Sequence, residues 1–249
     1  MIIDSYDNKT KPMVSLKNFY GERKHLVDKC IIIFSRIIFE FILNNYKCEV
    51  IGEIKACNGN TKFYKFSFKG EDIAFYLSPI GSSMASQYCI ECNWIIGASK
   101  FIMFGSAGSL DKNKTMGKFI IPTHAYRDEG MSYHYAAPQD YIEIKNSRKV
   151  KEIFDEIHIP YIEGRVWTTD AFLMETEELT NKRREEGCIA VEMELAGVQA
   201  VCNYYKMDLY NFIVTGDVLS SEEYQTEELK DANHNIDKFQ IALKIIERI

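Results

Sequence analysis

The sequence predicts an α/β fold in which a mixed β-sheet is covered by helices on both faces. Short runs of β-branched and aromatic residues alternate along the chain with segments whose apolar residues recur at the helical period. The runs at 101–104 and 209–214 are almost continuously apolar, which is typical of strands buried on both faces. Such alternation favours a parallel or mixed sheet between two helical layers.

The first half of the chain is predicted to be rich in strands. An N-terminal strand at 31–35 precedes three successive strands, which the turn signals at Gly59 and Lys69-Gly70 separate from one another. A helix and two short strands follow. The predicted ranges are 47–54, 62–68 and 72–77 for the three strands, 82–96 for the helix, and 101–104 and 119–122 for the short strands.

The second half is predicted to alternate more regularly. A helix at 146–157 and a strand at 165–169 come first. A short strand at 189–191 then leads into a helix whose apolar and small residues follow the 3.6-residue period, and the strand at 209–214 comes after it. The C-terminal helix carries one apolar stripe, formed by Ile236, Phe239, Leu243 and Ile246.

Composition narrows the class of protein. The 249 residues include 30 Lys and Arg against 36 Asp and Glu, and 46% of them are hydrophobic. This apolar content excludes a disordered chain, and the net charge of −6 argues against a nucleic-acid partner, which usually meets a basic stripe. No repeat or linker-like tract is visible, so residues 1–249 are expected to form a single domain.

Location is predicted from the N-terminus, the apolar runs and the cysteines. The chain starts without a basic and apolar leader, and its longest apolar stretch, 30–43, is broken by Ser35, Arg36 and Glu40, so no secretion signal or membrane contact is expected. Seven cysteines without small-domain spacing indicate free thiols in a reducing cytoplasm. Cys89 and Cys92 form a lone Cys-x-x-Cys pair, too few ligands for zinc.

Ligands of α/β sheets bind at the carboxyl ends of strands, so the residues that follow the apolar runs are the candidate site. After Phe104 comes Gly105-Ser106-Ala107-Gly108, which predicts a tight turn. Its backbone N–H groups could face an anion or a sugar hydroxyl, and an ordinary strand-to-loop turn is the alternative.

Carboxylates follow two further strands. Glu192 and Glu194 flank Met193 between a buried strand and a buried helix, where they either cap the helix or accept two hydroxyl hydrogen bonds from a sugar diol. Asp217 follows Gly216 directly after the strand at 209–214, where it either caps the next segment or titrates. The segment 220–226, anchored only by Tyr224, is expected to be a mobile loop.

Taken together, these segments resemble the superfamily of purine nucleoside phosphorylases, uridine phosphorylases and nucleosidases. The resemblance runs from about Gly81 to Ser220, and its strongest piece is Val191-Glu192-Met193-Glu194 followed by a small-residue helix and a strand that leads to Asp217. Three other segments match family features. These are Gly81-Ser82-Ser83-Met84-Ala85 before a helix, Trp167-Thr168-Thr169-Asp170-Ala171-Phe172, and the loop from Tyr126 to Tyr135.

The resemblance implies a three-layer α/β/α sandwich with a twisted mixed sheet, assembled as a dimer, trimer or hexamer. It implies cleavage of the N-glycosidic bond of a nucleoside without a metal or organic cofactor. The roles it implies are as follows: Asp217 donates a proton or a hydrogen bond to the base, Glu194 with neighbouring Glu192 binds the ribose hydroxyls, Met193 packs beneath the sugar, Phe172 stacks on the base, and Ser106 contacts phosphate or sugar with close approach allowed by Gly105 and Gly108.

The sequence lacks the residues with which phosphorylases of this family bind phosphate. The N-terminal strand lacks the family's Gly-Asp-Pro loop, and Met103 stands where the family has an arginine. Without arginine a phosphate dianion loses its strongest bidentate partner, which Arg36, Arg127 or a neighbouring subunit would have to replace. The nucleosidase branch instead uses a water-activating Glu, and Glu40 lies close to that position without matching it.

The expected function is phosphorolysis of purine nucleosides, with inorganic phosphate as co-substrate and free base and ribose 1-phosphate as products. Purine is favoured over uracil because the Gln-x-Arg pair of uridine phosphorylases is absent after Phe172. Two alternatives stay open. The first alternative is a hydrolytic nucleosidase of the methylthioadenosine and S-adenosylhomocysteine type. The second is a nucleoside-binding relative with weak catalysis.

Overall fold

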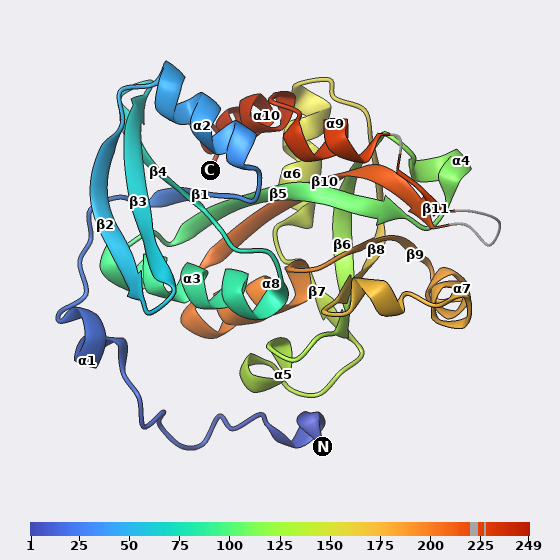
Figure 1. Cartoon of the computed structure of the whole chain (residues 1–249), viewed down its shortest axis with the longest axis horizontal. Helices are drawn as coiled ribbons and strands as arrows, with labels where there is room; N and C mark the ends of the chain where they lie inside the picture. Colours follow the sequence, from blue (N-terminus) through green and yellow to red (C-terminus); the bar gives the residue numbers. More distant parts are fainter. Residues whose placement is uncertain (220–223, 227) are drawn as a thin grey trace.

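A mixed β-sheet runs through the computed structural model, which describes residues 1–219, 224–226 and 228–249 (Figure 1). The strands of these residues, in chain order, are β1 (Lys29–Ile33), β2 (Glu49–Ala56), β3 (Gly59–Phe68), β4 (Glu71–Leu77), β5 (Lys100–Ser109), β6 (Phe119–Asp128), β7 (Tyr141–Glu143), β8 (Tyr161–Thr169), β9 (Cys188–Glu192), β10 (Asp208–Leu219) and β11 (Tyr224–Gln225).

Part of the sheet closes on itself. The strand order is β11-β10-β6-β8-β9-β5-β1-β4-β3-β2, and β10 also pairs with β5, so β10, β6, β8, β9 and β5 form a ring. Within the ring β5 and β10 are parallel over a long register, whereas β9 is antiparallel to β5. The ring brings the carboxyl ends of β5 and β10 against the start of the segment after β9.

Helices cover both faces, which confirms the predicted α/β fold with a mixed sheet. The core on one face contains residues of α3 (Ser82–Ile95) and α8 (Leu195–Tyr205), and the core on the other contains α2 (Arg36–Asn45), α6 (Ser147–Glu156) and α10 (Asp237–Ile246) (Figure 1). The shorter helices are η1 (Ile2–Asp4), α1 (Leu16–Tyr20), α4 (Lys112–Thr115), α5 (Ser132–Tyr135), η2 (Phe172–Met174), α7 (Glu177–Glu185) and α9 (Leu229–His234).

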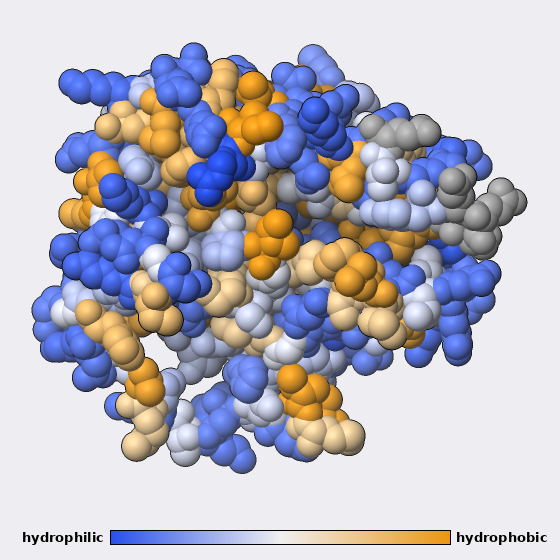
Figure 2. All heavy atoms as spheres, viewed as in Figure 1, coloured by the Kyte–Doolittle hydropathy of each residue, from blue (hydrophilic) through white to orange (hydrophobic). Residues whose placement is uncertain are grey.

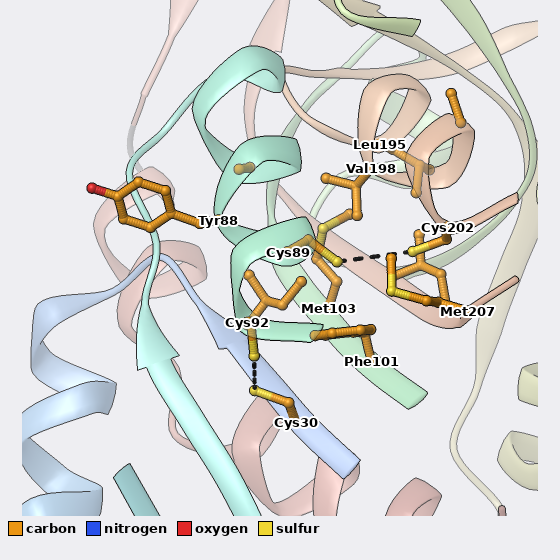
Figure 3. Packing of buried hydrophobic residues seen from close by; sticks show 14 of the residues in the cluster. Cys30, Tyr88, Cys89, Cys92, Phe101, Met103, Leu195, Val198, Cys202 and Met207 are labelled. Carbon is orange, nitrogen blue, oxygen red and sulfur yellow. Dashed lines mark hydrogen bonds between the residues drawn. The ribbon is translucent and has the colours of Figure 1, made fainter. Parts of the chain in front are cut away.

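The core beneath α3 and α8 is rich in sulfur. The Sγ atoms of Cys89 on α3 and Cys202 on α8 lie 4.0 Å apart, and those of Cys92 and Cys30 lie 3.6 Å apart (Figure 3). These side chains are fully buried among apolar neighbours, and the thiols are free. In the Cys-x-x-Cys pair of the sequence, Cys89 therefore packs between α3 and α8, and Cys92 packs between α3 and β1.

Two strand ends predicted from the sequence lie farther along the chain. The segment at Gly105 to Gly108 was expected to be a tight turn, but it is part of β5, and Asp217 was expected after a strand, but it lies within β10. Both corrections have one cause. β5 and β10 pair in parallel from Lys100 and Asp208 onward through Ser109 and Val218, so their backbone groups are satisfied as a ladder.

The apolar stretch at 30–43 divides at Ser35 into a strand and a helix. Ser35 is the N-cap of α2, and its Oγ accepts a hydrogen bond from the backbone N–H of Ile38. The helix was not predicted, because the stretch is mostly apolar and its few polar residues show no clear period. Ser35 thereby points from the carboxyl end of β1 toward the same edge of the sheet as β5 and β10.

The surface shows no continuous apolar band on the face seen in Figure 2, where polar and apolar side chains are interspersed. Within the described ranges, no helix combines the length and the apolar character that crossing a bilayer requires. Of the segment 220–226, which was expected to be a mobile loop, residues 220–223 lie outside the described residues.

Candidate active site

A cavity of about 400 Å³ opens at the carboxyl ends of β5, β9 and β10, a size that suits a small organic ligand. Every site residue expected from the sequence except Arg127 lines it. These residues are Gly105, Ser106, Gly108, Phe172, Glu192, Met193, Glu194 and Asp217. The fold therefore brings together side chains that are up to about half the chain apart in sequence.

A β-bulge places Asp217. The register of β5 and β10 shifts between Thr215 and Asp217, so Gly216 is the extra residue and the direction of the next side chain changes. A Cβ at Gly216 would press on the Cβ of Ala232 and lie 2.9 Å from the Cα of Leu229. Glycine thus allows α9 to pack directly on β10 beside Asp217.

Asp217 sits in a setting that favours its protonated form. The residue is 7% exposed, and burial raises the pKa of its carboxyl, while a hydrogen bond of 2.9 Å from the Tyr224 hydroxyl to Oδ2 opposes that rise. Gly108 lies directly opposite on β5, where a Cβ would come within 3.3 Å of Oδ2. A carboxyl in this state can donate a proton to a leaving base.

Glu175 is a second acid on this part of the wall. It follows η2 and lines the cavity with Asp217 and Tyr224. Burial and, to a smaller extent, the negative charge of Asp217 raise the pKa of Glu175 to about 7. Two neighbouring carboxyls resist simultaneous ionisation, so Glu175 keeps its proton to a higher pH than an isolated carboxyl does.

The two glutamates after β9 have different surroundings. Glu192 Oε2 accepts the backbone N–H groups of Glu194 and Leu195, each at 2.7 Å, and its Oε1 accepts the hydroxyl of Thr168. Glu192 therefore caps the N-terminus of α8, one of the two roles expected for this pair. Its carboxyl also forms part of the cavity wall.

A backbone N–H group holds the Glu194 carboxylate at one of its oxygens. Its Oε1 accepts the backbone N–H of Gly81 at 2.7 Å, and Gly81 has a φ of 102°, which favours glycine. Burial raises the pKa of Glu194 to about 7. The Gly81 segment at the start of α3 thus orients Glu194 in the cavity, beside the half-buried Met193.

Phe172 provides an aromatic wall. It lies on η2, lines the cavity and is 56% exposed, unlike a core phenylalanine. An aromatic ring that is open on one side can stack on a planar heterocycle. Ile80, Leu173 and Met174 are also exposed apolar side chains, and Ile80 lines the same cavity.

Another part of the wall is formed by hydroxyl groups and a cation. Ser35 Oγ lies 2.8 Å from Nδ1 of His234, and Ser106 Oγ donates to Oδ1 of Asn233. Lys238, at the start of α10, lines the cavity beside them. Burial lowers the pKa of its ammonium group to about 8.

The expected substitutes for the family's phosphate arginines lie elsewhere. Arg127 is 3% exposed and donates to Ser132 Oγ and to the carbonyls of Ala136, Ala137 and Gln139, so it holds the loop after β6 together. Arg36 is exposed and lies 3.9 Å from Glu40. Neither side chain lines the cavity.

Sequence reasoning missed Glu175, Tyr224, His234 and Lys238. The first stands in an acidic segment with no strand end to mark it, and the last two lie in helices whose pattern suggests only a solvated or apolar face. Glu175 reaches the cavity from the end of η2, Tyr224 from β11, and His234 and Lys238 from α9 and α10, which pack on β5 and β10. Their place at the cavity depends on tertiary contacts and could not be predicted from local sequence patterns.

A family model described as "Phosphorylase superfamily" matches residues 30–247. The chain belongs to this superfamily. The purine nucleoside phosphorylase DeoD-type of Caldanaerobacter subterraneus subsp. tengcongensis is 26% identical over 214 residues, covering 85% of this chain and 89% of that relative. The 5'-methylthioadenosine/S-adenosylhomocysteine nucleosidase of Buchnera aphidicola subsp. Schizaphis graminum is 30% identical over 176 residues, covering 67% and 72%.

Solved structures of two hydrolytic enzymes share the fold. Futalosine hydrolase of Helicobacter pylori has a TM-score of 0.72 at 19% identity, covering 90% of this chain and 99% of that one. The methylthioadenosine and S-adenosylhomocysteine nucleosidase of Campylobacter jejuni also has a TM-score of 0.72, at 20% identity, covering 90% and 100%. The superfamily consists of enzymes that cleave nucleosides, and the names of these relatives divide between phosphorylases and nucleosidases.

Proposed function

We propose that this protein cleaves the N-glycosidic bond of purine nucleosides with phosphate, releasing the free base and ribose 1-phosphate. One observation carries the proposal: the carboxyls of the half-buried Glu194 and the buried Asp217 line one cavity together with Phe172 and Met193. One carboxyl is held by a backbone N–H, and the other is biased toward its protonated form. The pair suits a substrate with hydroxyls at one end and a departing heterocycle at the other.

Glu194 binds the sugar in this proposal. Its second oxygen accepts a ribose hydroxyl, and ionisation on substrate binding places a negative charge next to the ribosyl ring. Positive charge develops on that ring as the glycosidic bond breaks, so the carboxylate stabilises the transition state more than the ground state. Met193 supplies apolar contact beneath the ring.

Asp217 acts on the base. The departing purine carries negative charge, which a proton or a hydrogen bond from Asp217 neutralises. Phe172 stacks on the heterocycle, and a purine offers it a larger face than a pyrimidine does. The proposal therefore assigns a catalytic role to Asp217 and binding roles to Glu194, Met193 and Phe172.

Phosphate as the nucleophile is supported by the curated relatives and by charge. The phosphorylase of C. subterraneus aligns with most of this chain, and Lys238 places a cation on the cavity wall beside Ser106. Hydrolysis is the second candidate function. It is favoured by the absence of arginine among the described lining residues and by the four carboxyls there, of Glu175, Glu192, Glu194 and Asp217, which repel a dianion.

The partners that belong to this proposal are small molecules and further copies of the chain. The apolar side chains of Ile80, Phe172, Leu173 and Met174 are exposed at or near the cavity, and exposed apolar patches mark interaction surfaces. A homo-oligomer would cover them. No organic cofactor or metal enters the proposed reaction.

Product analysis tests the function. Inosine, adenosine and uridine are each incubated with the protein in phosphate-free buffer and again with phosphate, and base, ribose and ribose 1-phosphate are quantified. The proposal predicts purine release only with phosphate, together with an equal amount of ribose 1-phosphate. Free ribose in phosphate-free buffer would establish hydrolysis, and binding without any product would establish a nucleoside-binding relative.

A further inference from the structure

We propose that Lys238, with Ser35, Ser106 and His234, forms a subsite for a phosphate group on the wall of the active-site cavity. The sequence showed no replacement for the family's phosphate arginines, and this cluster from α9, α10 and the ends of β1 and β5 fills that role. The inference rests on the proposed function, because it takes phosphate to be a substrate group. Inorganic phosphate and the 5'-phosphate of a nucleotide share the chemistry that this cluster recognises.

The charge of Lys238 lacks a counter-ion. Its side chain is 1% exposed, and no carboxylate of the described residues lies within 4.0 Å of Nζ, whereas the buried Lys29 has a partner in Glu71. Burying an unpaired ammonium group is costly, so a protein retains one where another charge arrives. Since Lys238 lines the cavity, an anion bound there would supply that charge.

The hydrogen bonds of Lys238 also support an anion site, because they leave one of its donors free for a ligand. Nζ donates to the backbone carbonyls of Ala232 and Asn233, which hold it at the junction of α9 and α10. An ammonium group has three N–H donors, so one remains for a ligand. Lys238 is therefore fixed in position before any ligand binds, and little side-chain entropy is lost when an anion arrives.

Ser35, Ser106 and His234 surround this donor with further polar groups. Ser35 Oγ and His234 Nδ1 are 2.8 Å apart, and Ser106 bonds to Asn233, the residue whose carbonyl also accepts from Lys238. Ser35 is the N-cap of the ten-residue helix α2, whose N-terminus carries partial positive charge. Hydroxyls can turn from protein partners to phosphate oxygens.

Three of the four carboxyls that line the cavity accept hydrogen bonds from groups outside this cluster. Asp217 accepts from Tyr224, Glu194 from Gly81, and Glu192 from Thr168 and the start of α8. None of the three forms an ion pair with Lys238. None of these three carboxyls therefore neutralises the ammonium group of Lys238, which stays available to an anion.

Binding measurements on the intact protein test the subsite. Calorimetric titrations with inorganic phosphate and with adenosine 5'-monophosphate compare wild type, Lys238→Met and Lys238→Arg, in phosphate-free buffer. Lys244→Met removes an exposed lysine of the same helix as the matched control. Titration with adenosine, which carries no phosphate, verifies that each variant has kept a folded nucleoside site.

We expect Lys238→Met to weaken binding of one of the two phosphate compounds by about tenfold or more, as loss of a charge-assisted hydrogen bond does, with adenosine binding unchanged. Lys238→Arg should restore part of it, and Lys244→Met should behave as wild type. Loss confined to inorganic phosphate identifies the co-substrate, and loss confined to the nucleotide identifies a 5'-phosphate.

Unchanged affinity for both compounds in Lys238→Met, with adenosine binding intact, would overturn the subsite. So would wild-type protein that binds neither. If Lys238→Met loses adenosine binding as well, the Lys238→Arg variant decides: restored adenosine binding without phosphate binding contradicts the proposal, and restoration of both supports it. Failure of the proposed function is separate, because it would appear as wild-type release of ribose in phosphate-free buffer.

Discussion

The hydroxyl of Tyr224 donates a 2.9 Å hydrogen bond to Oδ2 of Asp217, the carboxyl proposed to act on the base. A donor of this kind stabilises the ionised form of an acid, while burial in the cavity disfavours it. The balance of these two effects sets the pKa of Asp217, and with it the pH above which the carboxyl loses its proton. Tyr224 lies on the short strand β11, which pairs with the end of β10.

Removing that hydroxyl should shift the pH dependence of the reaction. Activity that needs protonated Asp217 is lost as pH rises through its pKa. Tyr224→Phe removes a group that lowers the pKa, so the alkaline limb of the kcat/KM profile should move to higher pH. An alkaline limb that stays in place, or moves to lower pH, would contradict this assignment. Tyr204→Phe, at a partly exposed tyrosine of α8, is the control.

Asp217→Asn should lower kcat for purine nucleosides by about 100-fold or more, the usual contribution of general acid catalysis. Asparagine keeps the volume of the side chain and lacks the proton. Steady-state kinetics with inosine measure the effect. Asp208→Asn, at the exposed start of the same strand, should leave kcat unchanged. Equal kcat for wild type and Asp217→Asn would remove Asp217 from the chemistry.

Glu194→Gln should chiefly harm recognition of the ribose hydroxyls. If the amide oxygen accepts the Gly81 N–H in place of Oε1, the NH2 group faces the sugar and donates where a carboxylate oxygen accepted, and the charge beside the sugar is lost. The ratio of kcat/KM for a ribonucleoside to that for its 2'-deoxy analogue should fall by about tenfold, the scale of one such hydrogen bond. Glu185→Gln on α7 serves as the exposed control. An unaltered ratio would place the sugar elsewhere.

Glu175 predicts a pH dependence of stability in the ligand-free protein. Its pKa is about 7 in the folded protein and 4.5 in an unfolded chain, so the folded state binds more protons and loses stability as pH rises from about 4.5 to 7. Glu175→Gln should therefore raise Tm more at pH 8 than at pH 5. Differential scanning calorimetry measures this, with the exposed Glu178→Gln as control. A gain that is larger at pH 5 would contradict the burial of this acid.

Thiol labelling tests the core beneath α3 and α8. Cys57 is the exposed cysteine, whereas burial raises the pKa of the thiols of Cys89 and Cys92, which makes them poor nucleophiles. One thiol should react rapidly with a disulfide reagent in the folded protein, and all seven should react in denaturant. Cys57→Ser should abolish the rapid phase. Rapid reaction of Cys89 or Cys92 would show that the helices do not seal this core.

The sequence was informative where a local pattern and a strand end coincide. Glu194 follows a short apolar strand and precedes a small-residue helix, so its place at the edge of the sheet could be predicted. The extent of β5 and β10 could not, because their ladder depends on pairing between residues about a hundred positions apart. The segment from Gly105 to Gly108 has a glycine pattern that is typical of a turn, but it forms a strand because it pairs with β10.

Lys238 illustrates what a linear reading misses. It lies near the stripe of the C-terminal helix, where a lysine usually faces solvent, yet the junction of α9 and α10 turns it into the cavity. α9 packs directly on the bulge at Gly216, and no local propensity encodes that contact. Arg36 and Arg127 have the residue type that binds phosphate, but tertiary contacts place both of them away from the cavity wall.

A crystal structure of the protein with an uncleavable purine nucleoside analogue would show where the sugar and the base lie relative to Glu194 and Asp217. The account predicts ribose hydroxyls within hydrogen-bond distance of Glu194, the heterocycle against Phe172, and a ring nitrogen facing Asp217. A nucleoside bound with its sugar away from Glu194 and its base away from Asp217, or bound outside this cavity, would contradict it.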